Sequence, residues 1–172
     1  VIASGGIDLS VGAVMAVAGA LAPILFLSEW GQANPALGLF AAILLPLCVA
    51  AVCGVFNGTL ISLLGVQPIV ATLIFFISGR GIAQVMTNGN LQTFLNPSFT
   101  WLGTGRVLGL PVQGWIALAL MLMIAWVVRR TLYGRYLLAI GGNERAAALA
   151  GVPVARVKIA TYAISATLAG LA

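Results

Sequence analysis

Apolar residues dominate this chain and fall in runs of about 20, the length of helix that crosses a hydrocarbon core about 30 Å thick at about 1.5 Å per residue. Polar or glycine- and proline-containing segments separate these runs. The pattern predicts an all-α, polytopic transmembrane helix bundle with about five spans. The expected spans are 11–28, 37–64, 69–86, 115–128 and 159–172.

The segments between the runs predict the connections. We expect a short loop at 29–35, a tight turn at 65–68 and a stretch at 87–111 that is too polar to cross lipid. Trp101 and Trp115 would lie at the membrane interface. The second run is long enough to tilt or to bend at Pro46, and Ser78-Gly79-Arg80-Gly81 should interrupt the third span.

Composition supports lipid as the solvent, because 62% of the residues are hydrophobic and only 6% are charged, against about 25% in a soluble domain. A net charge of +5 could suit nucleic acid, but six of the eight basic residues cluster in one loop between spans, which argues against such a partner. Under the positive-inside bias, this loop at 129–158 is cytoplasmic, which places 65–68 inside and both 29–35 and 87–111 outside. The cluster comprises Arg129, Arg130, Arg135, Arg145, Arg156 and Lys158.

Small residues recur at a spacing of four in several predicted spans. This spacing stacks them on one helix face and lets helix backbones approach closely in a membrane. It predicts a compact bundle. The series are Gly12, Ala16 and Ala20; Ala50, Gly54 and Gly58; and Ala166 and Gly170.

The basic loop contains a signal for a short helix of about two turns. Asn143 is a suitable N-cap, Glu144 suits the positive start of a helix, and Gly151 followed by Pro153 would end it. This helix could dock into a groove of a partner and pass on its movement. The alternative is a loop helix that rests on the membrane surface.

Ionisable and amide side chains in or near the spans are candidates for a translocation pathway. Asp8 and Ser10 lie at a glycine break before the first span, where Asp8 either caps the helix or lines a pathway. Arg80 is costly in a span unless it snorkels, lines water or pairs with an acid, and we expect a pair with Asp8. Asn57, Gln67 and Thr72 could line the pathway or hydrogen-bond between helices.

Several kinds of chemistry lack their residues. The chain contains no histidine, and Cys48 and Cys53 have no metal-ligand spacing, so we expect no metal site and no catalytic residues. A phosphate-binding loop of the G-x-x-x-x-G-K-[ST] type is also missing, hence any ATP must bind another chain. Both ends run directly into apolar sequence, from which we expect a longer protein around residues 1–172.

Two patterns together resemble a known family. Gly5-Gly6-Ile7-Asp8-Leu9-Ser10-Val11-Gly12 near one end, and Gly134-Arg135 through Gly141-Gly142-Asn143-Glu144 to Ala150-Gly151-Val152 near the other, resemble the ribose-type permeases of bacterial ABC sugar importers. Phe56-Asn57-Gly58, Gln67-Pro68-Ile69-Val70-Ala71-Thr72-Leu73 and Gly79-Arg80-Gly81 also fit. The chain looks closest to the galactofuranose-type branch.

The resemblance implies a single transmembrane permease domain over 1–172, part of a permease with roughly ten spans in the bacterial inner membrane. Its expected partners are a second permease subunit, identical or different, ATPase subunits that bind ATP and Mg²⁺, and a periplasmic sugar-binding protein. The chain itself would bind no cofactor. It would move a monosaccharide inward by alternating access; an ion-coupled secondary transporter of a small polar solute is the alternative.

The resemblance and the polar residues of the spans together give roles to particular residues. Those expected to engage the ATPase are Gly134, Arg135, Gly141, Gly142, Asn143, Glu144, Ala147 and Gly151. Those expected along the translocation pathway are Asp8, Ser10, Asn57, Gln67, Thr72 and Arg80.

Overall fold

A computed structural model describes residues 1–90 and 97–172, and these residues are mostly helical. The only strands among them form one short antiparallel hairpin, with Arg106 opposite Pro111. The elements in chain order are η1 (Ile2–Ser4), α1 (Val11–Leu27), α2 (Glu29–Ala33), α3 (Pro35–Ser62), α4 (Pro68–Met86), α5 (Pro97–Thr104), β1 (Arg106–Val107), β2 (Leu110–Pro111), α6 (Val112–Arg130), α7 (Leu132–Gly142), α8 (Glu144–Leu149) and α9 (Val154–Leu171).

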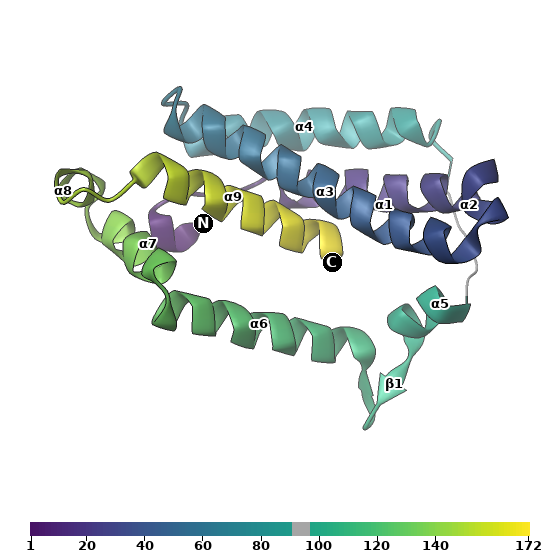
Figure 1. Cartoon of the computed structure of the whole chain (residues 1–172). Helices are drawn as coiled ribbons and strands as arrows, with labels where there is room; N and C mark the ends of the chain where they lie inside the picture. Colours follow the sequence, from purple (N-terminus) through teal and green to yellow (C-terminus); the bar gives the residue numbers. More distant parts are fainter. Residues whose placement is uncertain (91–96) are drawn as a thin grey trace.

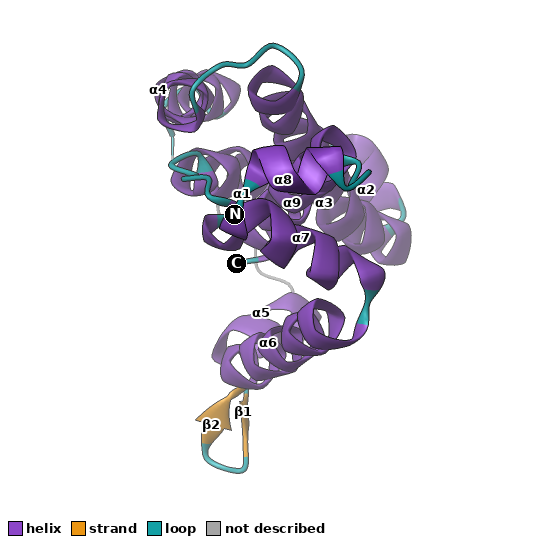
Figure 2. Cartoon of the chain, turned by 90° about the vertical axis from the view of Figure 1, so that its left-hand side faces the viewer, coloured by secondary structure: helices purple, strands orange, loops and turns teal. Residues whose placement is uncertain are grey.

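Helices α1, α3, α4 and α9 form a bundle, whereas α6 stands apart from it and joins it through α7 (Figures 1 and 2). Figure 1 shows η1, α7, α8 and the turn between α3 and α4 at one end of the molecule, and α2, α5 and β1 at the other. We call these the α8 end and the α2 end. The arrangement confirms the predicted all-α bundle.

The predicted small-residue spacing lies at the closest helix contacts. A Cβ atom placed on Gly54 of α3 would overlap the backbone carbonyl of Tyr162 in α9, and one on Gly58 would lie 2.7 Å from Ile159 Cα. A Cβ on Gly170 would lie 2.7 Å from the Cβ of Ala50. Glycine at these positions therefore allows α3 and α9 to pack backbone against backbone.

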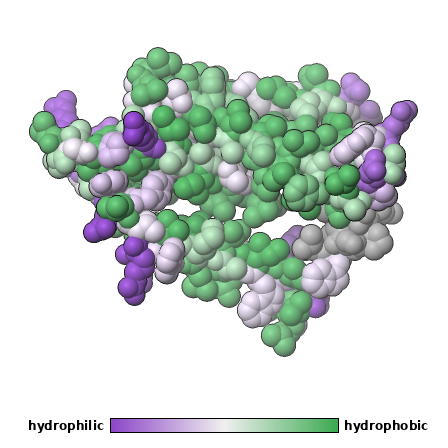
Figure 3. Space-filling model, in the orientation of Figure 1, coloured by the Kyte–Doolittle hydropathy of each residue, from purple (hydrophilic) through white to green (hydrophobic). Residues whose placement is uncertain are grey.

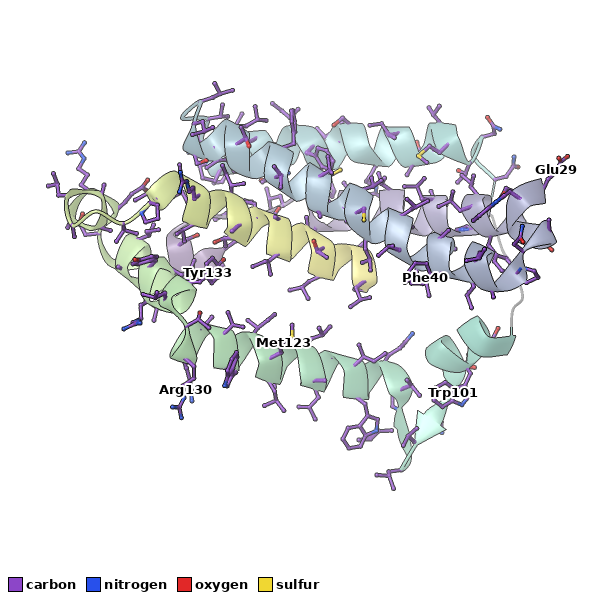
Figure 4. The ribbon with its side chains drawn as sticks, viewed as in Figure 1. Glu29, Phe40, Trp101, Met123, Arg130 and Tyr133 are labelled. Carbon is purple, nitrogen blue, oxygen red and sulfur yellow. The ribbon has the colours of Figure 1, made fainter. Side chains whose placement is uncertain are left out.

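Four helices in the described part of the chain, α3, α4, α6 and α9, are long and apolar enough to cross a membrane. Helix α1 is apolar but has only 17 residues. The hydropathy surface in Figure 3 agrees: apolar residues cover the middle of the molecule, and hydrophilic residues gather at its two ends. Glu29 and Arg130, labelled in Figure 4, lie at opposite ends.

The prediction of a loop at 29–35 is wrong, because this segment contains helix α2. Ser28 caps this helix by accepting a hydrogen bond from the Gly31 amide at 3.1 Å. Glu29 supplies a negative charge in the first turn, where the helix dipole favours it.

The predicted interruption at 78–81 is also wrong, since α4 runs unbroken through both glycines. Gly79 serves packing: a Cβ there would lie 3.0 Å from the Cβ of Ala13 in α1. Gly81 faces open space. A glycine inside a helix costs about 1 kcal/mol of helix stability relative to alanine. The helix-forming residues on either side of the two glycines offset this cost.

The basic region 129–158 is more helical than expected. Arg129 and Arg130 end α6, and α7 follows at once, capped by Thr131, whose Oγ1 accepts from the Gly134 amide at 3.3 Å. The last predicted span, α9, begins at Val154 instead of residue 159. Arg156 and Lys158 therefore lie in its first turns and not in a loop.

Candidate functional site

The most polar site within the spans surrounds Asp8, which precedes α1. Asp8 Oδ1 accepts hydrogen bonds from the Ser10 amide at 3.0 Å and from Ser10 Oγ at 2.6 Å. Asp8 Oδ2 accepts from Ser165 Oγ of α9 at 2.9 Å. Asp8 bonds the amide of Ser10, the residue that directly precedes α1, and the N-terminus of α1 receives no side-chain capping bond, so Asp8 does not cap this helix.

Ser10 extends this site to α3. Its side chain is 1% exposed, and its Oγ accepts a 3.1 Å hydrogen bond from the Asn57 side-chain amide. We call Asp8, Ser10, Asn57 and Ser165 the polar cluster. It joins the segment before α1 to both α3 and α9.

The polar cluster lies at membrane depth. Ser165 is 11 residues beyond the first residue of α9, about 16 Å along that helix, and Asn57 is about 8 Å from the last residue of α3. Residues 5–10 reach this depth without helical structure, from η1 beside α7 to the first turn of α1 (Figure 1). Non-helical backbone at such depth is tolerated only where protein or water surrounds it.

Two buried polar atoms of this region have no hydrogen-bond partner among the described residues: Asn57 Oδ1 and the Tyr162 hydroxyl. Gly6 lies against Tyr162, because a Cβ on Gly6 would be 2.6 Å from that hydroxyl. An unsatisfied buried polar atom costs about 1–3 kcal/mol. The site thus holds unused hydrogen-bonding capacity next to the polar cluster.

The expected ion pair between Asp8 and Arg80 is wrong. Among the described residues, Asp8 bonds to serine groups and Arg80 forms no ion pair. The Arg80 guanidinium instead lies over the Phe76 ring, 5.6 Å from its centroid, on the part of α4 nearer the α2 end. Hydroxyl and amide donors satisfy the carboxylate because they come from the adjacent turn and from α9.

Two other predicted pathway residues lie away from the polar cluster. Gln67 is exposed in the turn before α4 and makes no side-chain capping bond. Thr72 is fully buried, and its hydroxyl bonds the Pro68 carbonyl of its own helix at 2.8 Å. The structure therefore brings together Asp8, Ser10 and Asn57, but not Gln67, Thr72 or Arg80.

A second candidate site is helix α8 at the end of the molecule that carries most basic residues. Asn143 Oδ1 accepts a 3.0 Å bond from the Ala146 amide, which confirms the predicted N-cap. Ala147 is buried, whereas Ala148 is exposed and Leu149 is 91% exposed. One face of α8 is anchored, and the other presents small and apolar side chains outward beside the exposed Arg145.

The anchored face of α8 packs on α7 and α9. Ala147 joins a small core with Leu137, Ile140 and Val157. Lys158 Nζ contacts both carboxylate oxygens of Glu144 at 2.7 Å. Through these contacts α8 is held directly on the first turns of a membrane-spanning helix.

Three of the four glycines predicted for this site have structural roles. A Cβ on Gly134 would overlap the Val128 backbone, and one on Gly141 would overlap the Ala3 carbonyl of η1. Gly151 ends α8 with a φ of +83°, a conformation that favours glycine. Gly142 faces open space, and Arg135 is exposed on α7.

Sequence reasoning missed Ser165 and Tyr162. Both stand in the apolar run of the last span, where a lone hydroxyl is the available signal. Ser165 bonds Asp8 and Tyr162 lies against Gly6, both more than 100 residues earlier, and only the packing of α9 on α3 and α1 reveals these neighbours. In the described residues, no group of three His, Cys, Asp or Glu side chains could hold a metal ion.

Comparison with known proteins shows the family of the chain. The family model described as "Branched-chain amino acid transport system / permease component" matches residues 1–172. The galactofuranose transporter permease protein YtfT of Escherichia coli is 40% identical over 172 residues, covering 100% of this chain and 48% of the relative. The fructose import permease protein FruF of Bifidobacterium longum is 38% identical, with coverage of 100% and 48%.

The ribose import permease protein RbsC of Escherichia coli is 37% identical, with 100% of this chain and 53% of the relative covered. The chain therefore spans about half the length of these relatives. No solved structure matches the chain.

Proposed function

Since this chain belongs to the family of permease components of branched-chain amino acid transport systems, we propose that it is part of the sugar-translocating permease of an ATP-driven importer in the bacterial inner membrane. The observation that carries the proposal is the match of the whole chain to permeases named for galactofuranose, fructose and ribose. The substrate is accordingly a monosaccharide of this kind.

The position of α8 supports a coupling role. It lies at the end with most basic residues, which the positive-inside bias places in the cytoplasm. Its outward face carries Ala148, Leu149 and the cationic Arg145, and its inward face is fixed on α7 and α9. A partner ATPase that pushes on Ala148 and Leu149 moves α9 with them, because the Glu144–Lys158 contact and the small core transmit the displacement.

The polar cluster supports a role in translocation. Movement of α9 at Lys158 also moves Ser165, which bonds Asp8 at membrane depth. The unpaired Asn57 Oδ1 and Tyr162 hydroxyl lie beside this contact and offer hydrogen bonds to the hydroxyls of a sugar. Breaking and forming of the Ser165–Asp8 bond thereby links the movement of α8 to the translocation pathway.

The complete transporter comprises this permease, a second permease subunit, ATPase subunits that hold ATP and Mg²⁺, and an external sugar-binding protein. The chain contains no phosphate-binding loop, which assigns nucleotide binding to the ATPase. Residues 87–90 and 97–111, together with α2, face the binding protein at the α2 end.

Transport by the full-length complex in proteoliposomes tests this function. Uptake of ribose, fructose or galactofuranose should require ATP on the side of the membrane that carries the ATPase subunits. It should continue when the proton and sodium gradients are collapsed. Uptake that stops with the gradients while ATP remains would identify an ion-coupled secondary transporter instead. Asp8→Asn then tests the cluster: unimpaired transport by this variant would remove the need for a charged Asp8.

A further inference from the structure

A polar groove lies between α1 and α4, separate from the polar cluster. Its volume is about 300 Å³. One wall is the row formed by Arg80 and Gln84 of α4 and by Thr87, which directly follows α4, and Asn90 lies at its end. The facing surface is α1, where Gly19 and its alanine neighbours provide a flat floor. We call this the α1–α4 groove.

The polar row belongs to one side of α4. Positions 80, 84 and 87 follow the i, i+4, i+7 spacing, which places three side chains on the same helix face. They flank the side through which α4 packs on α1, where Gly79 and Ala83 are buried. Ser78 occupies the opposite flank and bonds the Ile74 carbonyl of its own helix at 2.9 Å.

Much of the hydrogen-bonding capacity of this row is unused. The side chain of Gln84 makes no hydrogen bond within the described residues, and Arg80 has no carboxylate partner there. The guanidinium face stacks on Phe76, which leaves its N–H groups at the edge to donate. The Thr87 hydroxyl donates a hydrogen bond to the Ala83 carbonyl of α4.

The depth of Arg80 calls for water or a solute. It lies six residues before the last residue of α4, about 9 Å along the helix. Ionisable residues at such positions in membrane proteins typically line water-filled paths or substrate sites. A volume of about 300 Å³ is at the small limit of ligand pockets, which suits one monosaccharide and not a longer oligosaccharide.

We infer that the α1–α4 groove is the site where a neutral monosaccharide first binds the permease after release from the binding protein. Arg80 and Gln84 donate hydrogen bonds to adjacent sugar hydroxyls, and the small residues of α1 allow the ring to lie close to the helix. This inference rests on the proposed function, since it assigns a sugar site at the α2 end, where that function places the outer face. The sugar then passes to the polar cluster at greater depth.

Thiol labelling of the full-length complex in proteoliposomes tests the site. Cys48 and Cys53 are first replaced by serine, and Gln84→Cys is compared with Ser78→Cys, its control on the opposite flank of α4. A membrane-impermeant methanethiosulfonate reagent should modify position 84 faster than position 78 and block uptake. Saturating sugar-loaded binding protein should slow the modification at position 84 only.

Two shape-preserving variants give a second measurement. Gln84→Leu should lower sugar uptake about 3- to 10-fold and Arg80→Met about 10- to 100-fold, as expected for loss of a neutral and of a charged hydrogen bond. ATP hydrolysis by the assembled complex should stay within about twofold, which shows that both variants fold and assemble.

The outcomes separate this inference from the proposed function. If the unmodified complex shows no ATP-dependent sugar uptake, the proposed function fails. Slow labelling of position 84 in the same complex would separately show that the groove is not accessible to water. The unmodified complex could instead transport sugar while position 84 reacts no faster than position 78, or reacts equally with and without sugar. The groove would then not be the sugar site, and the proposed importer function would be unaffected.

Discussion

The hydrogen bond between Ser165 and Asp8 gives a measurable test of the polar cluster. Ser165→Ala removes one bond of 2.9 Å from α9 to the Asp8 carboxylate and leaves the other two bonds of Asp8 intact. Interhelical hydrogen bonds in membranes contribute about 0.6 kcal/mol on average and at most about 1.7 kcal/mol. Because the acceptor is a carboxylate, we expect a loss of about 1–1.7 kcal/mol in the free energy of unfolding.

A double-mutant cycle isolates this bond. Asp8→Ala removes all three hydrogen bonds and should cost about 2–5 kcal/mol. In the Asp8→Ala background, Ser165→Ala should cost less than about 0.5 kcal/mol, since its partner is already missing. Unfolding of the full-length protein in mixed micelles, by titration with sodium dodecyl sulfate, provides the free energies.

Ser78→Ala is the matched control, because Ser78 bonds only its own helix and is exposed. It should change the free energy of unfolding by less than about 0.5 kcal/mol. Equal losses for Ser165→Ala with and without Asp8 would refute the bond and, with it, the connection between α9 and the segment before α1.

Three further predictions concern packing and helix α8. Gly54→Ala should destabilise the bundle by about 1–3 kcal/mol, because its Cβ would overlap the backbone of α9. Gly81→Ala, in open space, should stabilise the bundle by up to about 1 kcal/mol. The same titration in detergent measures both free energies of unfolding. Asn143→Ala removes the N-cap of α8 and should weaken that helix by about 0.5–2 kcal/mol, seen as faster hydrogen exchange at amides 144–149, with unchanged exchange counting against the cap. Lys158→Gln should cost less than about 1 kcal/mol and lose its effect in high salt, because Glu144 is 52% exposed; a larger, salt-independent loss would show that the pair is more shielded than its exposure indicates.

The sequence predicts most helices because their signals are local. Runs of apolar residues give the spans, and Asn143 with Gly151 marks the limits of α8. Helices α2 and α7 were missed because their polar and glycine-containing sequences resemble loops, whereas single capping bonds from Ser28 and Thr131 favour helix. Local patterns predict where long helices form, but they are a weak guide to where short helices begin.

The candidate site was only partly predictable for a different reason. Asp8 and Asn57 stand out as polar residues within apolar sequence, yet their common contact through Ser10 depends on how α3 packs against the segment before α1. The charge argument paired Asp8 with Arg80, but three hydrogen-bond donors nearer in space satisfy the carboxylate. Long-range partners follow from packing, which one sequence does not reveal.

The central claim, that α8 transmits ATPase movement to the permease, is tested most directly by photo-crosslinking. A photoreactive amino acid at exposed Ala148 of the full-length protein, in membranes with its native neighbours, should capture a chain that bears a phosphate-binding loop. The same group at exposed Trp30, on α2 at the opposite end, should not capture that chain. Capture of lipid alone at Ala148, despite abundant ATPase, would show that α8 rests on the membrane and would contradict the coupling role.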